Sequence, residues 1–178
     1  MQATRNSNEA AASAAENDSI EVQANGSISS EAYASSSSLG AIPTAIHNLK
    51  SLQINFVALD FDQTILKVHT GGRWPGTEKE LLEHVRPVFW ELIPELQLAG
   101  IEVAVVTFSR QISLVRGVLD AIMTTAERHG VLQLPNPAKP SGRIPIRGND
   151  HSWKYTGKGS QRGKQPHMAS AVEELEYR

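Results

Sequence analysis

The stretch FVALDFDQTIL, residues 56–66, decides how the rest of the chain is interpreted. A nearly continuous apolar run over residues 54–59 leads directly into two acids, Asp60 and Asp62, which only Phe61 separates. Such a run predicts a strand buried on both faces, as in a parallel sheet. Neighbouring carboxylates repel each other unless a cation or a reaction requires them there. The stretch therefore predicts a chemical site at the carboxyl end of a buried strand.

Helical patterns flank this strand. Apolar residues recur at helical spacing over residues 42–52, which predicts a helix before it. Glycines and a proline within residues 69–76 predict a loop after it. Thr77 and Glu80 then have the spacing of a capping box, so we expect a helix to begin there.

Apolar residues continue at helical spacing over residues 81–98, but two prolines lie within this pattern. Pro87 and Pro94 both interrupt it, and we expect a break or kink near Arg86. Gly100 is a suitable helix end.

A second strand and helix follow. The apolar run over residues 101–109 predicts a second buried strand, and Ser109 is expected to cap a helix that ends at Gly130. The segment 143–148 predicts a short strand, and Pro166 is expected at the first position of a last helix.

This order of elements predicts where the site residues meet. Strand, helix, strand and helix form a right-handed crossover unit with parallel strands. The carboxyl ends of parallel strands lie at one edge of the sheet, where ligands bind. We therefore expect Asp60, Asp62 and Thr107 to converge.

Length and composition limit the classes of protein to which the chain can belong. The chain has 178 residues, of which 40% are hydrophobic and 20% charged, as in a globular domain. The net charge of -2 argues against a protein built as a whole for nucleic acid or an anionic membrane. No cysteine is present, which excludes disulfides and thiolate metal sites. No signal peptide or membrane-spanning run is recognisable, and we expect a cytoplasmic location.

The chain divides into a tail and one domain. Residues 1–40 are rich in Ser, Ala, Asn and Glu, with few large apolar residues, and predict a disordered tail. Residues 41–178 form the predicted α/β domain.

A basic segment lies near the end of that domain. Its cations are Lys139, Arg143, Arg147, Lys154, Lys158, Arg162 and Lys164, against Asp150 alone. This charge is suited to attracting a phosphorylated substrate, and no nucleic-acid recognition module is evident. The sequence GKGSQRGK lacks the glycine spacing of a phosphate-binding P-loop.

Two acids at a strand end can divide the work of phosphoryl transfer. One can attack an electrophile while the other donates a proton to the leaving group and later activates water. A hard cation such as Mg²⁺ would relieve their repulsion. Thr107 could hydrogen-bond a phosphoryl oxygen, and a lysine could balance the charge of the transition state.

These segments resemble the haloacid dehalogenase-like hydrolases. DFDQT is similar to the first motif of that family, VVTFS resembles the second and GKQPHM the third. The resemblance implies a three-layer Rossmann-like parallel sheet with a small or absent cap. It implies that Asp60 is the nucleophile and Asp62 the general acid and base. It also implies that Thr107 orients the phosphoryl group and that Lys164 stabilises both the nucleophile and the phosphate. Mg²⁺ would be held by Asp60, the Asp62 backbone carbonyl and further acids.

The resemblance also implies a function and one departure. The expected activity is that of a Mg²⁺-dependent phosphatase acting on a phosphoprotein or a small phosphorylated molecule. The aspartates of the fourth motif are not found, and Glu173 and Glu174 lie on the last helix as poor substitutes. We therefore expect the domain to lack the last strands of the fold. The alternative function is an inactive or truncated module that binds a phosphorylated ligand or a protein.

Structural roles compete with each catalytic role. The two aspartates could cap a turn, and Thr107 could be a strand-end hydroxyl satisfied by the backbone. Lys158 competes with Lys164 for the role of the cation. For His167 a structural or surface role is preferred, and His69 is a further residue that could approach the substrate.

Overall fold

The computed structural model describes residues 40–71, 73–133, 141–155 and 163–177. The predicted disordered tail lies outside the described residues, apart from Gly40. Three cations of the basic segment, Lys139, Lys158 and Arg162, also lie outside them.

The described residues form helices and strands in alternation. In chain order the elements are α1 (Ala41–Ser51), β1 (Phe56–Leu59), the π-type turn η2 (Phe61–Ile65), α2 (Glu78–Leu82), α3 (Pro87–Leu98), β2 (Glu102–Val106), α4 (Ile112–Arg128), β3 (Ile146–Arg147) and α5 (Gln165–Glu176). Each helix and strand predicted from periodicity has a counterpart here.

The strands form a small parallel sheet in the order β1-β2-β3. In the register, Leu59 pairs with Val105, and Val105 pairs with Ile146 on its other side. The predicted α/β class and the parallel pairing of the first two strands are confirmed. Because all three strands run the same way, their carboxyl ends lie at one edge of the sheet.

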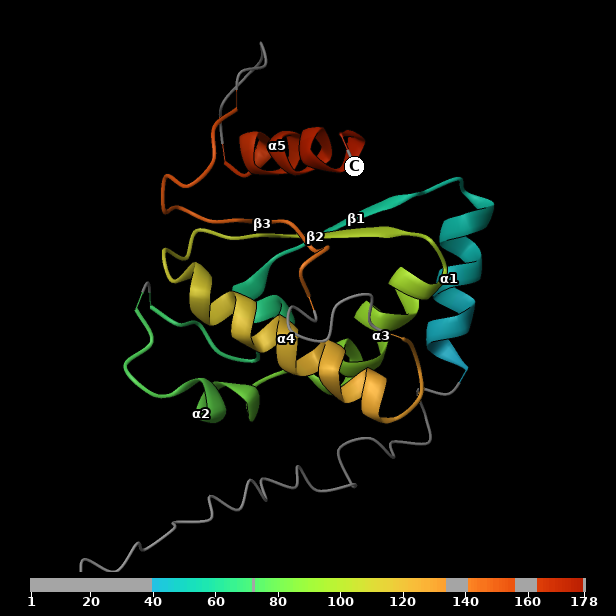
Figure 1. Cartoon of the computed structure of the whole chain (residues 1–178), viewed down its shortest axis with the longest axis horizontal. Coiled ribbons are helices and arrows are strands. Elements are labelled where there is room, and N and C mark those ends of the chain that lie inside the picture. The colour runs from blue at the N-terminus through green and yellow to red at the C-terminus, as the bar shows by residue number, and fades with distance from the viewer. Residues whose placement is uncertain (1–39, 72, 134–140, 156–162, 178) are drawn as a thin grey trace, which may run out of the picture.

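Helices lie on both sides of this sheet (Figure 1). Helix α5 contacts β2 and β3 on one side, whereas α3 and α4 pack together and contact β2 and β3 on the other. Short α2 packs on α4, and α1 packs on α3. The central strand β2 is therefore buried from Val103 to Val106.

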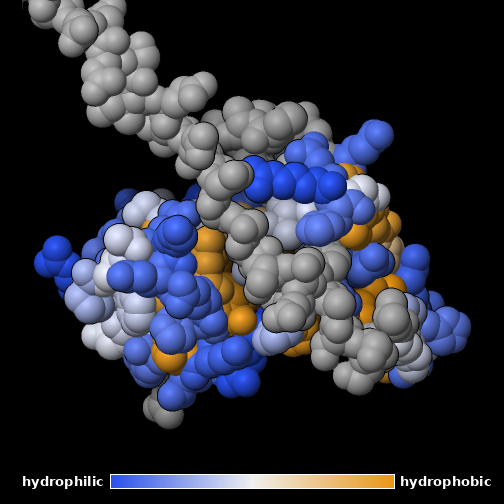
Figure 2. Space-filling view, turned by 90° about the horizontal axis from the view of Figure 1, so that it is seen from below, coloured by the Kyte–Doolittle hydropathy of each residue, from blue (hydrophilic) through white to orange (hydrophobic). Residues whose placement is uncertain are grey.

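The face of the molecule that Figure 2 shows is mainly polar. On the face shown in Figure 2, hydrophilic residues surround smaller areas where hydrophobic residues reach the surface. No helix in the described part of the chain is long and apolar enough to cross a membrane.

Local signals set the helix boundaries. Before α2, the Thr77 hydroxyl accepts a hydrogen bond from the Glu80 N–H, and the Glu80 carboxylate accepts one from the Thr77 N–H. Gly100 and Gly130 follow α3 and α4 with φ of +72° and +71°, a region that glycine adopts at little cost. Arg86 directly precedes α3, so the predicted break is confirmed.

The burial of β1 was predicted wrongly. Only Leu59 is buried in this strand, and Phe56, Val57 and Ala58 are partly exposed. The reason is that β1 is the edge strand of the described sheet, with β2 on one side only. An apolar run cannot distinguish an edge strand from a central one.

Three helix details also differ from the predictions. Pro94 does not interrupt α3, which runs through it with Pro94 buried. Ser109 is not the cap of α4, because Gln111 precedes the first helical residue and makes no side-chain cap bond. Pro166 is the second residue of α5 rather than the first, since Gln165 is already helical.

Candidate functional site

The turn after β1 explains why a phenylalanine separates the two acids. Asp60 and Asp62 both have extended backbone angles, with ψ of 157° and 131°. Side chains alternate along extended backbone, so the two acids share one side and Phe61 takes the other. Phe61 is fully buried in the core and anchors the turn. Gln63 then adopts a left-handed φ of 58°, which turns the chain away from the sheet.

A pocket of about 290 Å³ lies at this carboxyl edge of the sheet. Its lining comes from the ends of β1 and β2, the loop after η2 and the start of α5. The lining residues are Asp60, Asp62, Gln63, His69, Thr107, Phe108, Ser109 and Lys164. The predicted convergence of Asp60, Asp62 and Thr107 is confirmed, and Lys164 joins them.

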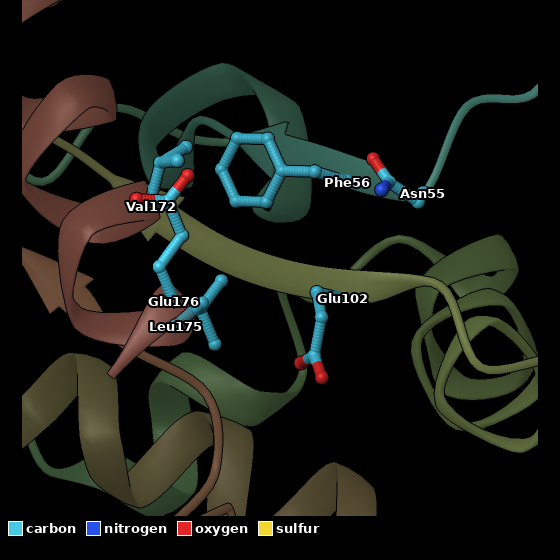
Figure 3. Close-up of a pocket in the computed structure, with 6 residues that line it drawn as sticks. All are labelled: Asn55, Phe56, Glu102, Val172, Leu175 and Glu176. Carbon is cyan, nitrogen blue, oxygen red and sulfur yellow. The ribbon is translucent and has the colours of Figure 1, made fainter. Parts of the chain in front are cut away.

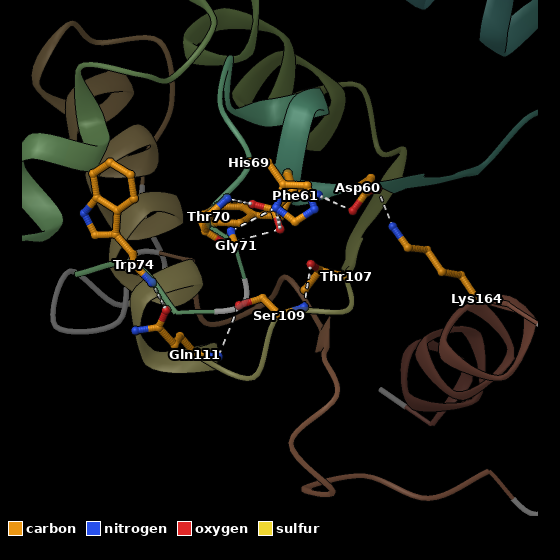
Figure 4. Close-up of polar contacts among 11 residues, drawn as sticks. Asp60, Phe61, His69, Thr70, Gly71, Trp74, Thr107, Ser109, Gln111 and Lys164 are labelled. Carbon is orange, nitrogen blue, oxygen red and sulfur yellow. Dashed lines mark hydrogen bonds and ion pairs between the residues drawn. The ribbon is translucent and has the colours of Figure 1, made fainter. Parts of the chain in front are cut away.

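Asp60 is held between a cation and a backbone amide (Figure 4). Its Oδ2 forms an ion pair with the ammonium of Lys164, and its Oδ1 accepts a hydrogen bond of 2.7 Å from the Phe61 N–H. Lys164 is the residue that directly precedes α5. The side chains of Asp60 and Lys164 are 37% and 23% exposed, so a substrate can reach the pair.

Asp62 is held by the loop that follows. Thr70 donates to its carboxylate twice, from its N–H over 2.9 Å and from its hydroxyl over 3.2 Å. His69 Nδ1 lies 3.7 Å from Asp62 Oδ2 and accepts a hydrogen bond from the Gly71 N–H. The contacts fix the direction in which Asp62 points.

Thr107 begins a chain of polar contacts that ties two loops together. Its hydroxyl oxygen accepts from the Ser109 N–H at 3.1 Å, and the Ser109 hydroxyl oxygen accepts from the Gln111 N–H at 3.2 Å. Gln111 Oε1 in turn accepts from the Trp74 N–H. The Thr107 N–H is held by the Arg147 carbonyl of β3. These bonds fix the loop after Asp62 against the end of β2 (Figure 4).

His167 lies beside the pocket, one helical turn after Lys164. It is 8% exposed, packs against the Trp153 and Phe108 rings, and has no hydrogen-bond partner for either ring nitrogen among the described residues. Burial, and secondarily the positive charge of Lys164, lowers the pKa of His167 below its usual value. These contacts agree with the structural role preferred from the sequence.

A second pocket lies at the opposite, amino-terminal end of the strands (Figure 3). It has a volume of about 250 Å³ between β1, β2 and the end of α5. Its lining residues are Asn55, Phe56, Glu102, Val172, Leu175 and Glu176. The charged groups in it are two carboxylates with no cation among the described lining. The pocket at the carboxyl end of the strands is therefore the stronger candidate for a functional site.

Sequence reasoning missed two residues that shape the site. Thr70 was not singled out, because its contact with Asp62 depends on how the loop returns. Phe108 was passed over although it lies between Thr107 and Ser109 and is 55% exposed. The sequence feature that could have identified Phe108 is a large apolar residue directly after the hydroxyl of Thr107 at the end of the predicted strand.

The donor set of the pocket is compatible with Mg²⁺. The described lining contains two carboxylates and one ammonium, so an anionic phosphate ester would need further positive charge. Mg²⁺ commonly binds one or two carboxylates and completes its shell with water and phosphate oxygens. Within the described residues no group of three or more His, Cys, Asp or Glu side chains is placed to hold a metal ion.

We compared the chain with protein-family models, with curated proteins and with solved structures, and none of these comparisons gave a match.

Proposed function

We propose that the chain is a Mg²⁺-dependent phosphatase of the haloacid dehalogenase type, which works through an aspartyl-phosphate intermediate. The observation that carries this proposal is the ion pair between Lys164 and Asp60, inside a pocket that Asp62 and Thr107 also line. Under this proposal the parallel sheet belongs to a three-layer Rossmann-like core. The four side chains are those that the three sequence motifs pick out.

In the first step Asp60 acts as the nucleophile. One of its carboxylate oxygens attacks phosphorus, and the bond between phosphorus and the ester oxygen breaks. Asp62 donates its proton to that departing oxygen, which leaves as an alcohol. Lys164 and the Thr107 hydroxyl donate hydrogen bonds to the phosphoryl oxygens as charge moves onto them.

In the second step the intermediate is hydrolysed. Water attacks phosphorus while Asp62, now a carboxylate, takes a proton from it. The bond between phosphorus and Asp60 breaks, inorganic phosphate is released and Asp60 is again a carboxylate. Thr70 keeps Asp62 directed at the same place in both steps.

Asp60 and the backbone carbonyl of Asp62 are the groups that would hold Mg²⁺, which when bound supplies positive charge to the phosphoryl oxygens. Because Lys164 already balances the Asp60 carboxylate and Asp62 enters the first step protonated, the cation need only offset the charge of the phosphate.

The substrate is a phosphorylated protein or small molecule. Between Asp62 and Thr107, helices α2 and α3 pack against α4, and α3 also packs on α1 and β2. None of the described residues that line the pocket belongs to α2 or α3, which supports the proposal of a small or absent cap. An open pocket can admit a phosphorylated side chain on a folded protein.

The test is hydrolysis of p-nitrophenyl phosphate with Mg²⁺ and with EDTA. Wild type is expected to turn over only with Mg²⁺, and Asp60→Asn to lose about a thousandfold or more of kcat because the nucleophile is removed. Asp150→Asn, which alters an acid outside the pocket lining, serves as the matched control. Acid-stable, hydroxylamine-sensitive labelling from radiolabelled substrate should be present in wild type and absent in Asp60→Asn.

Equal rates for wild type and Asp60→Asn would remove the phosphatase proposal. Binding of inorganic phosphate without any hydrolysis would instead support the alternative, a non-catalytic module for phosphorylated ligands. The ion pair of Lys164 gives that module a phosphate-binding cation as well.

A further inference from the structure

Phe108 is exposed at a place where its neighbours are not. Thr107 before it and Ser109 after it are 1% and 3% exposed, whereas Phe108 is 55% exposed and lines the carboxyl-end pocket. Exposing a large part of a phenyl ring to water forgoes stabilisation that burial would give. A ring left in this position beside reactive groups is available to contact a ligand.

The Phe108 ring is held in place from behind. It packs edge to face with the buried His167, with centroids 5.6 Å apart and planes at 87°. His167 in turn packs on Trp153, with centroids 4.5 Å apart. Because the ring is already positioned, a ligand that contacts it has less conformational entropy to lose on binding.

The ring also stands next to the reacting groups. The ammonium of Lys164 lies 5.2 Å from the centroid of Phe108 and forms the ion pair with Asp60. Phe108 directly follows Thr107, which lines the same pocket. A phosphoryl group between Asp60 and Lys164 would therefore place its alcohol portion within reach of the ring.

We propose that Phe108 is a specificity-determining residue that favours phosphate esters of aromatic alcohols. The inference rests on the proposed function and names the substrate class for the same pocket. The shared chemistry is an aromatic ring on the ester oxygen, either the phosphotyrosine side chain of a protein or a small aryl phosphate. Contacts between aromatic rings add selectivity beyond apolar burial, because their quadrupoles favour offset or edge-to-face packing.

A competing role for Phe108 makes a different prediction. The ring could act only by holding the Lys164 ammonium through a cation–π contact. Its loss would then weaken every phosphate ligand equally, whatever the alcohol portion. The ratio between an aromatic and a saturated ligand of the same size separates the two roles.

The experiment measures that ratio by isothermal titration of the full chain with Mg²⁺. Phenylphosphonate and cyclohexylphosphonate are the ligands, because neither can be hydrolysed and both rings have six carbons. In Phe108→Leu, phenylphosphonate affinity is expected to fall about two- to tenfold more than cyclohexylphosphonate affinity. Phe108→Tyr should keep the preference for the aromatic ligand. Leu98→Ala, a 54% exposed position outside the pocket lining, is the control and should behave as wild type.

Peptides distinguish the two sources of the aromatic ester. Faster hydrolysis of a phosphotyrosine peptide than of the matching phosphoserine peptide supports a protein substrate, and hydrolysis of phenyl phosphate alone supports a small one.

Equal weakening of both phosphonates in Phe108→Leu, or preference for the phosphoserine peptide, overturns the inference. Aromatic-selective binding without hydrolysis leaves the ring contact standing and removes the phosphatase proposal. Hydrolysis without aromatic selectivity removes the aromatic preference and leaves the phosphatase proposal standing. A wild type that neither binds the phosphonates nor hydrolyses any of the esters overturns both.

Discussion

At the scale of single residues, the direction of Asp62 depends on Thr70. The hydroxyl bond of 3.2 Å and the backbone bond of 2.9 Å occupy both carboxylate oxygens. A proton donor that is misdirected by a fraction of an ångström transfers its proton less well. Under the proposed function, Thr70 is therefore a positioning residue that acts through Asp62.

We predict that Thr70→Val lowers kcat by about tenfold on an alkyl phosphate while KM changes little, because proton donation to the leaving group is impaired. The loss should be smaller on p-nitrophenyl phosphate, whose leaving group needs less help from an acid. Steady-state kinetics on the two substrates checks this. Thr44→Val, which removes an α1 hydroxyl that donates to the carbonyl of Gly40 just before the helix, is the control. An equal loss on both substrates would contradict the positioning role.

His167 makes the stability of the fold depend on pH. Burial lowers its pKa in the folded state, so the unfolded chain takes up a proton first as pH falls below about 6.5. Stability is unaffected above that pH, falls as pH drops toward the lowered pKa, and levels off below it. The fall is at most about 1.4 kcal/mol for each pH unit.

The prediction is that His167→Phe loses less stability than wild type between pH 7.5 and pH 5. Phenylalanine keeps the ring contacts with Trp153 and Phe108 and cannot take up a proton. Urea unfolding at several pH values measures the difference. Parallel pH profiles for the two proteins would show that His167 is not the titrating group.

At the scale of elements, helix α5 is fastened to the sheet by one buried arginine. Arg147 of β3 donates to the Ser170 hydroxyl at 2.9 Å, to the Ser170 carbonyl at 3.1 Å and to the Glu174 carboxylate at 2.6 Å. Arg147 itself is 9% exposed. Removing a buried donor leaves its acceptors without that partner, which is costly.

We predict that Arg147→Met destabilises the protein by about 2–4 kcal/mol. It should also lower kcat, because α5 brings Lys164 to Asp60. Urea unfolding and steady-state kinetics measure the two effects. Arg128→Met, at an exposed position in the last turn of α4, should change stability by less than about 0.5 kcal/mol. A stable but inactive Arg147→Met would show that the bonds direct α5 without stabilising the fold.

The elements show how far periodicity and capping rules reach. The helices and strands were predictable because apolar spacing, Thr77 with Glu80, and the terminal glycines are local signals. The exposure of β1 and the continuation of α3 through Pro94 were not, since both depend on what packs beside them. Ser109 was mistaken for a cap because its hydroxyl bonds the Gln111 N–H just before the helix.

At the scale of the whole molecule, the site could be predicted where topology alone decides it. Asp60 and Thr107 follow adjacent parallel strands, so their convergence depends only on the order of elements. Thr70 and Phe108 could not be placed in this way. The first depends on the path of a loop, and the second on the packing of a ring against α5.

The attachment of α5 determines whether the pocket contains its lysine. Lys164 directly precedes α5, and the other pocket residues described here belong to the segments around β1 and β2. Proteins open locally in cooperative units at a lower free energy than global unfolding. A brief detachment of α5 would carry the ammonium away and leave Asp60 facing Asp62 without a counter-ion, while the sheet stays folded. The fraction of molecules in which Lys164 is paired with Asp60 then depends on how often α5 is attached to the sheet. Amide hydrogen exchange in α5 would measure this.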